Sequence, residues 1–265
     1  PIAMAIVGET SVEGEEGIQM STISTSRVLG RGFGPLIGGA IYAAFGMSSV
    51  FLVMSGLSVV AFVMVLLFIP DTKDLGVQKN TLSYRQVLKS VRIRGLFLYR
   101  FTRAINLGVF FVFLPLFATV IGLSVFEIGV LISSILVLTA LLQRPFGYLA
   151  DRFDRLNLII FGFIFSAIPL FILPYTSNFV ELIFLCSFIG VGRALSMPPS
   201  LALTIEIGRK IGMGFAMGLL STAMGIGMIT ASLTSGFLLD FYGINLPFYF
   251  AGIISIITAP IIYLL

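Results

Sequence analysis

The chain has 265 residues, of which 58% are hydrophobic and 11% are charged, and its mean hydropathy is +1.09. A soluble domain carries about 25% charged residues, so this composition excludes an ordinary water-soluble fold and requires apolar segments that face lipid. The sequence has no His and a single Cys, Cys186, which excludes a disulfide framework and a His- or Cys-rich metal site. We therefore predict no metal and no cofactor. The net charge of +4 needs no nucleic-acid partner, because membrane proteins concentrate Lys and Arg in cytoplasmic loops.

Long hydrophobic runs predict an all-α membrane protein, because a hydrocarbon core of about 30 Å needs about 20 helical residues. The predicted spans are 17–45, 47–69, 96–121, 126–149, 157–174, 179–205, 211–240 and 246–265. Residues 1–8 read as the end of an earlier span. The polar stretch 70–95 predicts a linker with a short amphipathic helix near 82–93 on the membrane surface.

Charge placement predicts the orientation of these spans. If 70–95 is cytoplasmic, the Lys and Arg residues outside the spans fall on the inner side, and the outer loops near 45, 123, 176 and 244 carry none. This is the positive-inside pattern of membrane proteins, which a soluble helical bundle has no reason to show. We therefore predict a multi-pass protein of the plasma (inner) membrane with residues 70–95 in the cytoplasm.

An internal repeat predicts the architecture. Residues 1–68 laid over 198–265 without gaps give 14 identities, among them Pro1/Pro198, Glu9/Glu206 and Gly39/Gly236. Parallel repeats of this kind characterise transporters built from two similar halves. We predict the end of a first six-helix half at 1–69, a linker at 70–95 and a complete second half at 96–265. By this symmetry about a hundred residues should precede Pro1, and the complete protein is expected to be a monomer.

A glycine-rich segment carries the most specific motif. Residues 30–39 read Gly-Arg-Gly-Phe-Gly-Pro-Leu-Ile-Gly-Gly. Gly30, Gly34 and Gly38 recur every four residues, so they predict a helix face that another helix approaches closely, and Pro35 predicts a kink. The string GxxxGPxxGG, completed by Gly39, resembles the fifth-span signature of drug:proton antiporters of the major facilitator superfamily. An ordinary packing face of small residues is the alternative.

A second motif lies at 144–155, Arg-Pro-Phe-Gly-Tyr-Leu-Ala-Asp-Arg-Phe-Asp-Arg. It resembles the same family's loop between the second and third spans of a half, through Gly147, Leu149, Asp151, Arg152 and Arg155. Asp154 stands where the family usually has Gly. The resemblance implies a latch on the inner gate, in which Asp151 meets a helix N-terminus and the arginines meet acids. The alternative is a solvated loop.

The acidic residues before the span at 17–45 are the expected partners of that latch. Our hypothesis pairs Glu13, Glu15 and Glu16 with Arg144, Arg152 and Arg155 when the inner side is closed. Each exposed pair contributes only about 0–1 kcal/mol, but a network that breaks on opening biases a two-state equilibrium.

Arginines within the spans mark candidate cavity residues. Arg193 lies about 21 Å along its helix, where an Arg costs about 2.5–3.5 kcal/mol on insertion scales. It is expected to face a cavity or to pair with a carboxylate. Arg103 and Asn106 share a face, with Arg103 close enough to the inner interface to snorkel, and Arg27 is the better candidate on the glycine-rich span. The predicted substrate cavity therefore contains Arg27, Arg103, Asn106 and Arg193.

The family resemblance implies alternating access and the efflux of small molecules driven by proton entry. The visible spans hold no deep acidic residue, so any proton-coupling carboxylate is expected before Pro1. A uniporter or exchanger for an organic anion is the alternative, favoured by the arginines within the spans. Against an intramembrane enzyme or receptor stand the absence of His and of a nucleophile with a visible base, and a channel has no reason for two repeated halves.

Overall fold

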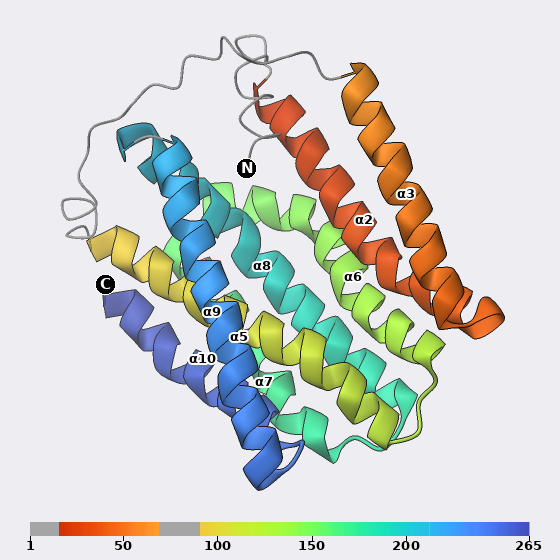
Figure 1. The fold of residues 1–265 in the computed structure, drawn as a ribbon. Coiled ribbons are helices and arrows are strands. Elements are labelled where there is room, and N and C mark those ends of the chain that lie inside the picture. Colours follow the sequence, from red (N-terminus) through yellow and green to blue (C-terminus); the bar gives the residue numbers. More distant parts are fainter. Residues whose placement is uncertain (1–15, 69–90, 212, 265) are drawn as a thin grey trace. The chain divides into compact units, whose positions relative to one another are not determined.

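The structure is a computed structural model that describes residues 16–68, 91–211 and 213–264 (Figure 1). The side chains of 16–29, 31, 151 and 209–215 lie outside the described part. Every regular element of the described residues is helical: α2 Glu16–Phe45, α3 Met47–Phe68, α5 Val91–Val120, α6 Val125–Arg152, α7 Arg155–Ile172, the 3-10 helix Leu173–Tyr175, α8 Phe179–Ile211, α9 Met213–Tyr242 and α10 Leu246–Leu264.

Each of the eight predicted spans coincides with one α-helix, so the all-α prediction is confirmed for the described residues. Seven of the helices are long and apolar enough to cross a membrane, and α2 contributes the apolar stretch Gly32–Phe45. The largest boundary difference at a helix start is in α5, which begins at Val91 rather than at 96. The predicted stub at 1–8 and most of the predicted helix at 82–93 lie outside the described residues.

Glycines in the left-handed backbone region end two equivalent helices. Gly46 after α2 has a φ of 79° and donates its N–H to the carbonyl oxygen of Tyr42 over 2.9 Å. Gly243 after α9 has a φ of 87° and donates to Leu239 over 3.0 Å. A side chain at either position would be strained, which is why Gly ends helices this way.

The internal repeat reappears in the helix bounds. Adding the shift of 197 to the bounds of α2, residues 16 and 45, gives 213 and 242, which are the bounds of α9. The same shift relates Gly46 to Gly243 and Tyr42 to Leu239, so the helix-ending hydrogen bond is also repeated. The predicted repeat is therefore confirmed in the bounds and ends of these two helices.

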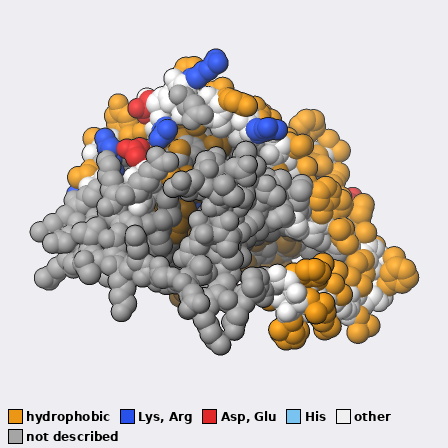
Figure 2. Space-filling model, turned by 90° about the horizontal axis from the view of Figure 1, so that it is seen from above, with side chains coloured by type: hydrophobic (Ala, Val, Ile, Leu, Met, Phe, Trp, Pro, Cys, Tyr) orange, Lys and Arg blue, Asp and Glu red, His pale blue; other side chains and the backbone are white. Residues whose placement is uncertain are grey.

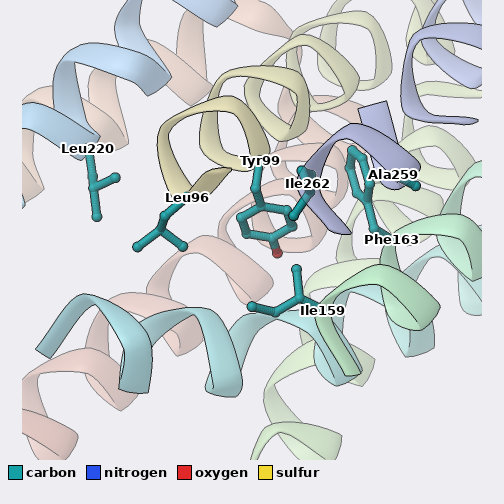
Figure 3. Packing of buried hydrophobic residues seen from close by; sticks show 7 residues of the cluster. All are labelled: Leu96, Tyr99, Ile159, Phe163, Leu220, Ala259 and Ile262. Carbon is teal, nitrogen blue, oxygen red and sulfur yellow. The ribbon is translucent and has the colours of Figure 1, made fainter. Parts of the chain in front are cut away.

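The chain forms two compact units, the first comprising 1–79 and 124–133 and the second comprising 80–123 and 134–265. In the second unit α7 packs against α8, α5 against α9, and α10 against both α5 and α7. Figure 3 shows seven side chains of its core, from α5, α7, α9 and α10: Leu96, Tyr99, Ile159, Phe163, Leu220, Ala259 and Ile262. The sequence-based division at 69 and 95 stays a prediction.

The surface of the described residues is strongly apolar. Helix α3 has a mean hydropathy of 2.8 in its most apolar window and no buried residue in the described structure. Where Figure 2 shows described residues, most of the coloured side chains are hydrophobic and charged side chains appear at only a few places. Exposing so large an apolar surface to water is energetically unfavourable. These helices are therefore embedded in lipid, and the chain is a multi-pass membrane protein.

Candidate functional site

A cavity opens inside the second unit between α5, α7 and α8. The space between its walls amounts to about 430 Å³ only when the open solvent at its mouth is counted, and the enclosed part is much smaller. Polar and apolar side chains both line it: Arg103, Asn106, Leu107, Phe110, Phe163, Ser166, Leu170, Ile189, Arg193 and Ser196. A mostly apolar wall with a few convergent polar groups is typical of small-molecule sites.

Helix α5 supplies the polar side of the cavity and is held in place by buried hydrogen bonds. The Tyr99 hydroxyl donates to Ser196 Oγ of α8 over 3.0 Å, and Thr102 and Thr258 join α5 to α10 through their hydroxyls over 3.2 Å. These bonds restrict the rotation of α5 about its axis, because they connect it to two different neighbouring helices, α8 and α10. As a result, residues one turn further along face the cavity.

Asn106 is oriented by a hydrogen bond whose direction can be worked out. Its Nδ2 lies 2.7 Å from Ser255 Oγ, while the Ser255 hydroxyl lies 2.8 Å from the carbonyl oxygen of Ala251. A carbonyl only accepts, so the Ser255 hydroxyl donates to Ala251 and accepts from Asn106. This arrangement fixes the amide of Asn106 with its nitrogen toward α10.

The side chain of Arg103 was expected to reach the inner membrane interface, but the structure places it elsewhere. Its side chain is buried, with 8% of its surface exposed, and lines the cavity. The physical reason is the earlier start of α5 at Val91, which places Arg103 about 18 Å along the helix instead of near its end.

Two glycines bring α7 and α8 into backbone contact beside the cavity. A Cβ built on Gly162 would lie 2.7 Å from the carbonyl oxygen of Gly192, and a Cβ on Gly192 would lie 2.7 Å from that of Gly162. Neither position therefore accepts a side chain. Arg193 follows Gly192 directly, so this close approach determines where its side chain leaves the backbone.

Three of the four predicted cavity residues, Arg103, Asn106 and Arg193, thus surround one cavity, and their contact with a substrate stays a prediction. The side chain of Arg27 lies outside the described residues. Sequence reasoning missed the wall that α7 provides, Phe163, Ser166 and Leu170, because such residues are common in any apolar helix. The pair Gly162 and Gly192 was the available signal for a close approach of α7 to α8.

The glycine-proline motif makes its close contact at one end only. Within the first unit, a Cβ on Gly39 would lie 3.2 Å from the Val125 carbonyl oxygen of α6, and a Cβ on Gly129 would lie 2.6 Å from the Pro35 carbonyl oxygen. A Cβ on Gly30, Gly34 or Gly38 would meet no described atom within 4 Å. The close approach seen in the described structure is that of Pro35 and Gly39, one turn apart, and the predicted face of Gly30, Gly34 and Gly38 stays a prediction.

The motif at 144–155 is mostly helical and not a loop. Helix α6 runs to Arg152 and includes Gly147, while α7 begins at Arg155, which leaves two residues between the helices. Asp154 caps α7 by accepting a hydrogen bond from the backbone N–H of Asn157 over 3.0 Å. Asp is a favoured N-cap residue, so the residue that departs from the family pattern has a clear structural use. The side chain of Asp151 lies outside the described part.

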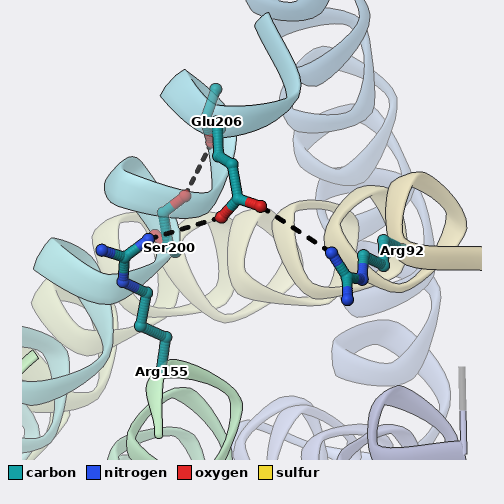
Figure 4. A network of polar contacts seen from close by, with 5 residues as sticks. Arg92, Arg155, Ser200 and Glu206 are labelled. Atoms are coloured by element: carbon teal, nitrogen blue, oxygen red, sulfur yellow. Dashed lines mark hydrogen bonds and ion pairs between the residues drawn. The ribbon is translucent and has the colours of Figure 1, made fainter. Parts of the chain in front are cut away.

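Arg155 forms an ion pair within the second unit. Glu206 of α8 lies 3.5 Å from Arg155 of α7 and 3.7 Å from Arg92 of α5, so one carboxylate joins three helix ends (Figure 4). Arg152 is exposed. Of the predicted acidic partners, Glu13 and Glu15 lie outside the described residues, as does the side chain of Glu16, and their pairing stays a prediction.

Comparison with known proteins identifies the family. The Major Facilitator Superfamily profile matches residues 1–137 and 95–265. Over its full length the chain is 28% identical to an uncharacterized MFS-type transporter of Methanocaldococcus jannaschii, covering 70% of that protein. Over 95% of its length it is 26% identical to the multidrug resistance protein MdtG of Proteus mirabilis, covering 65% of it. Over 88% it is 24% identical to a multi-drug resistance efflux pump PmrA homolog of Lactococcus lactis, covering 60% of it.

These matches agree with the membrane-spanning helices, the repeated helix bounds and the two motifs described above. The chain spans between 60% and 70% of the length of these three relatives. The chain belongs to the major facilitator superfamily.

Proposed function

We propose that this chain is part of a secondary transporter that exports small molecules by alternating access, with proton entry as the driving force. The names of two relatives, a multidrug resistance protein and an efflux pump, support export. In this mechanism two six-helix halves rock about a site near the bilayer midplane. The cavity suits such a site, because Arg103 and Arg193 both stand near the middle of their helices.

The single observation that carries the direction of transport is the intact glycine-proline motif seated against α6. Its carbonyl at Pro35 lies so close to Gly129 that no methyl group fits between the helices. So tight an interface between α2 and α6 resists leakage of protons and solutes while the rest of the protein moves. An exporter that works against a gradient needs this property. We place the proton-coupling carboxylate outside the described residues, because the described lining of the cavity contains no Asp or Glu.

We also propose the plasma membrane as the location and the cytoplasm as the side of residues 70–95. The charged cluster of Arg92, Arg155 and Glu206 supports this orientation, because α5 begins within that segment, at Val91, and carries Arg92 in its first turn. A cysteine introduced at Lys79 and tested with a membrane-impermeant thiol reagent checks it. Labelling in intact cells would place the segment outside and contradict the proposal, whereas labelling only after the membrane is opened supports it.

Dye efflux by the full-length gene product tests the transport proposal. Cells that lack their own exporters and express the protein should accumulate less rhodamine 123 than control cells, and a protonophore should abolish the difference. Gly39→Val should reduce efflux, because its side chain would clash with the backbone of α6. Gly56→Val on α3, where a Cβ meets no described atom within 4 Å, serves as the matched control. Efflux that persists without a proton gradient would contradict proton coupling.

A further inference from the structure

We infer that the cavity between α5, α7 and α8 binds the negatively charged group of an organic anion, with Arg103 and Arg193 as its cationic residues. The inference rests on the proposed function, because it takes this cavity as the transport site. It goes beyond that function by naming the substrate's charge and the residues that recognise it.

The charge of the lining is the first argument. The ten residues that line the cavity include two arginines and no acidic residue. Arg103 forms no ion pair with a described acid, and its Nε has no hydrogen-bond partner among the described residues, although its side chain is buried. A buried guanidinium is costly unless an anion or hydrogen-bond acceptors compensate it. An anionic ligand in the cavity supplies that compensation.

The position of the arginines is the second argument. Arg103 lies about 18 Å from the start of α5, and Arg193 about 21 Å from the start of α8. Neither side chain stands at a helix end, where a Lys or Arg reaches water at low cost. Both charges therefore lie away from the helix ends, with Arg103 buried and Arg193 half-buried, where a dielectric lower than that of water strengthens their attraction for an anion.

The remaining lining residues indicate the chemical character of the uncharged part of the ligand. Five of the ten residues are large and apolar: Leu107, Phe110, Phe163, Leu170 and Ile189. Ser166 and Ser196 are the small polar members, and both donate their hydroxyls to carbonyls of their own helices. These apolar side chains favour a ligand whose body is apolar or aromatic. The expected ligand is an aromatic organic anion rather than a small inorganic ion.

Two dyes with the same ring system and opposite charge test the inference. Fluorescein is an anion and rhodamine 123 is a cation, and both share a xanthene body. Fluorescence anisotropy with the purified full-length protein should show tighter binding of fluorescein than of rhodamine 123. Arg103→Gln and Arg193→Gln should each weaken fluorescein binding about tenfold or more, the effect of removing a charge-assisted hydrogen bond. Arg103→Lys should keep part of the affinity, since it keeps the charge but not the planar fork.

The matched control removes a charge from the same helix outside the cavity. Arg94 of α5 is exposed, and Arg94→Gln should leave fluorescein binding unchanged. Inaccessibility of the buried Cys186 thiol to a maleimide confirms that each variant is folded. If Arg103→Gln does not fold, Arg193→Gln decides the outcome.

Two results would overturn the inference. One is equal or tighter binding of rhodamine 123, and the other is unchanged fluorescein binding in folded Gln variants. Either would be expected if a carboxylate of the protein itself neutralised the arginines. A different result would contradict the proposed function. If fluorescein binding depends on the arginines but no gradient-driven efflux is seen, the export proposal is wrong and the anion site stands. Gradient-driven efflux of rhodamine 123 without fluorescein binding refutes the anion site and keeps the exporter.

Discussion

The hairpins α2–α3 and α9–α10 share one sequence pattern. In the described structure, however, α2 and α9 contact neighbouring helices through glycines at opposite ends of the pattern. In α9, a Cβ on Gly227 would meet Phe101 and Ala104 of α5, while its counterpart Gly30 in α2 faces no described atom within 4 Å. Toward the other end, Gly39 of α2 contacts α6, while its counterpart Gly236 in α9 faces no described atom within 4 Å. The repeat therefore specifies the helices and their turn, and the neighbouring helix decides which small residue is needed.

The largest expected difference between the copies is at Gly227 and Gly30. Gly227→Ala should destabilise the second unit by about 1–3 kcal/mol, because the new methyl group would overlap the Phe101 carbonyl oxygen and the Ala104 Cβ. Gly30→Ala should be neutral or slightly stabilising, since Ala favours the helix. Heating the purified protein with a fluorogenic maleimide measures this, because the buried Cys186 reacts only on unfolding. Equal melting temperatures for the two variants would break the comparison.

The reverse difference is expected at Gly39 and Gly236. A Cβ on Gly39 would lie 3.2 Å from the Val125 carbonyl oxygen and 3.3 Å from the Phe126 Cα, which is tight but less severe than at Gly227. Gly39→Ala should therefore cost about 1 kcal/mol, and Gly236→Ala should cost nothing measurable. Hydrogen exchange of α2 and α9 in the same sample reports both. Faster exchange of α2 in the first variant is the expected result, and faster exchange of α9 in the second would contradict it.

Ser255 and its repeat counterpart Ser58 sharpen the comparison at a single hydrogen bond. Both hydroxyls donate to the carbonyl four residues earlier, each over 2.8 Å, but Ser255 also accepts from Asn106. Ser255→Ala should cost about 0.6 kcal/mol, the usual value between membrane helices, because Asn106 loses its partner. Ser58→Ala, at an exposed position, should have no effect. Thermal unfolding followed at Cys186 distinguishes them, and equal losses would show that the Asn106 bond contributes nothing.

The smallest effect is expected at Glu206, the counterpart of Glu9. Glu206→Gln removes the carboxylate that joins Arg92 and Arg155, but these side chains are partly exposed. The loss should be about 0–1 kcal/mol and should shrink as the salt concentration rises. Melting temperatures at low and high salt measure it. A loss that does not depend on salt would show that Glu206 acts through packing rather than charge.

The sequence predicted the helices well because their length and apolarity are local properties. The sequence also predicted that Arg103, Asn106 and Arg193 line one cavity. Charged or strongly polar residues deep in a span are rare, because they are costly there unless they face a cavity or a partner. The partners of the small residues were not predictable. Gly39 and Gly236 occupy equivalent positions of the repeat, and the described structure gives only Gly39 a neighbouring helix within contact distance. The same holds for Arg155, whose contact with Glu206 joins residues 51 positions apart.

Helix length has a consequence for the thickness of the surrounding bilayer. The 22 residues of α3 span about 33 Å, close to the hydrocarbon core of about 30 Å, whereas the 30 residues of α5 span about 45 Å. The longer helix must tilt or extend into the headgroup layer. If it extends, its first turn brings Arg92 to the level of the lipid phosphates, which would compete with Glu206 for the guanidinium. A thicker membrane would draw that end of α5 into the hydrocarbon, so acyl-chain length should tune the strength of this ion pair.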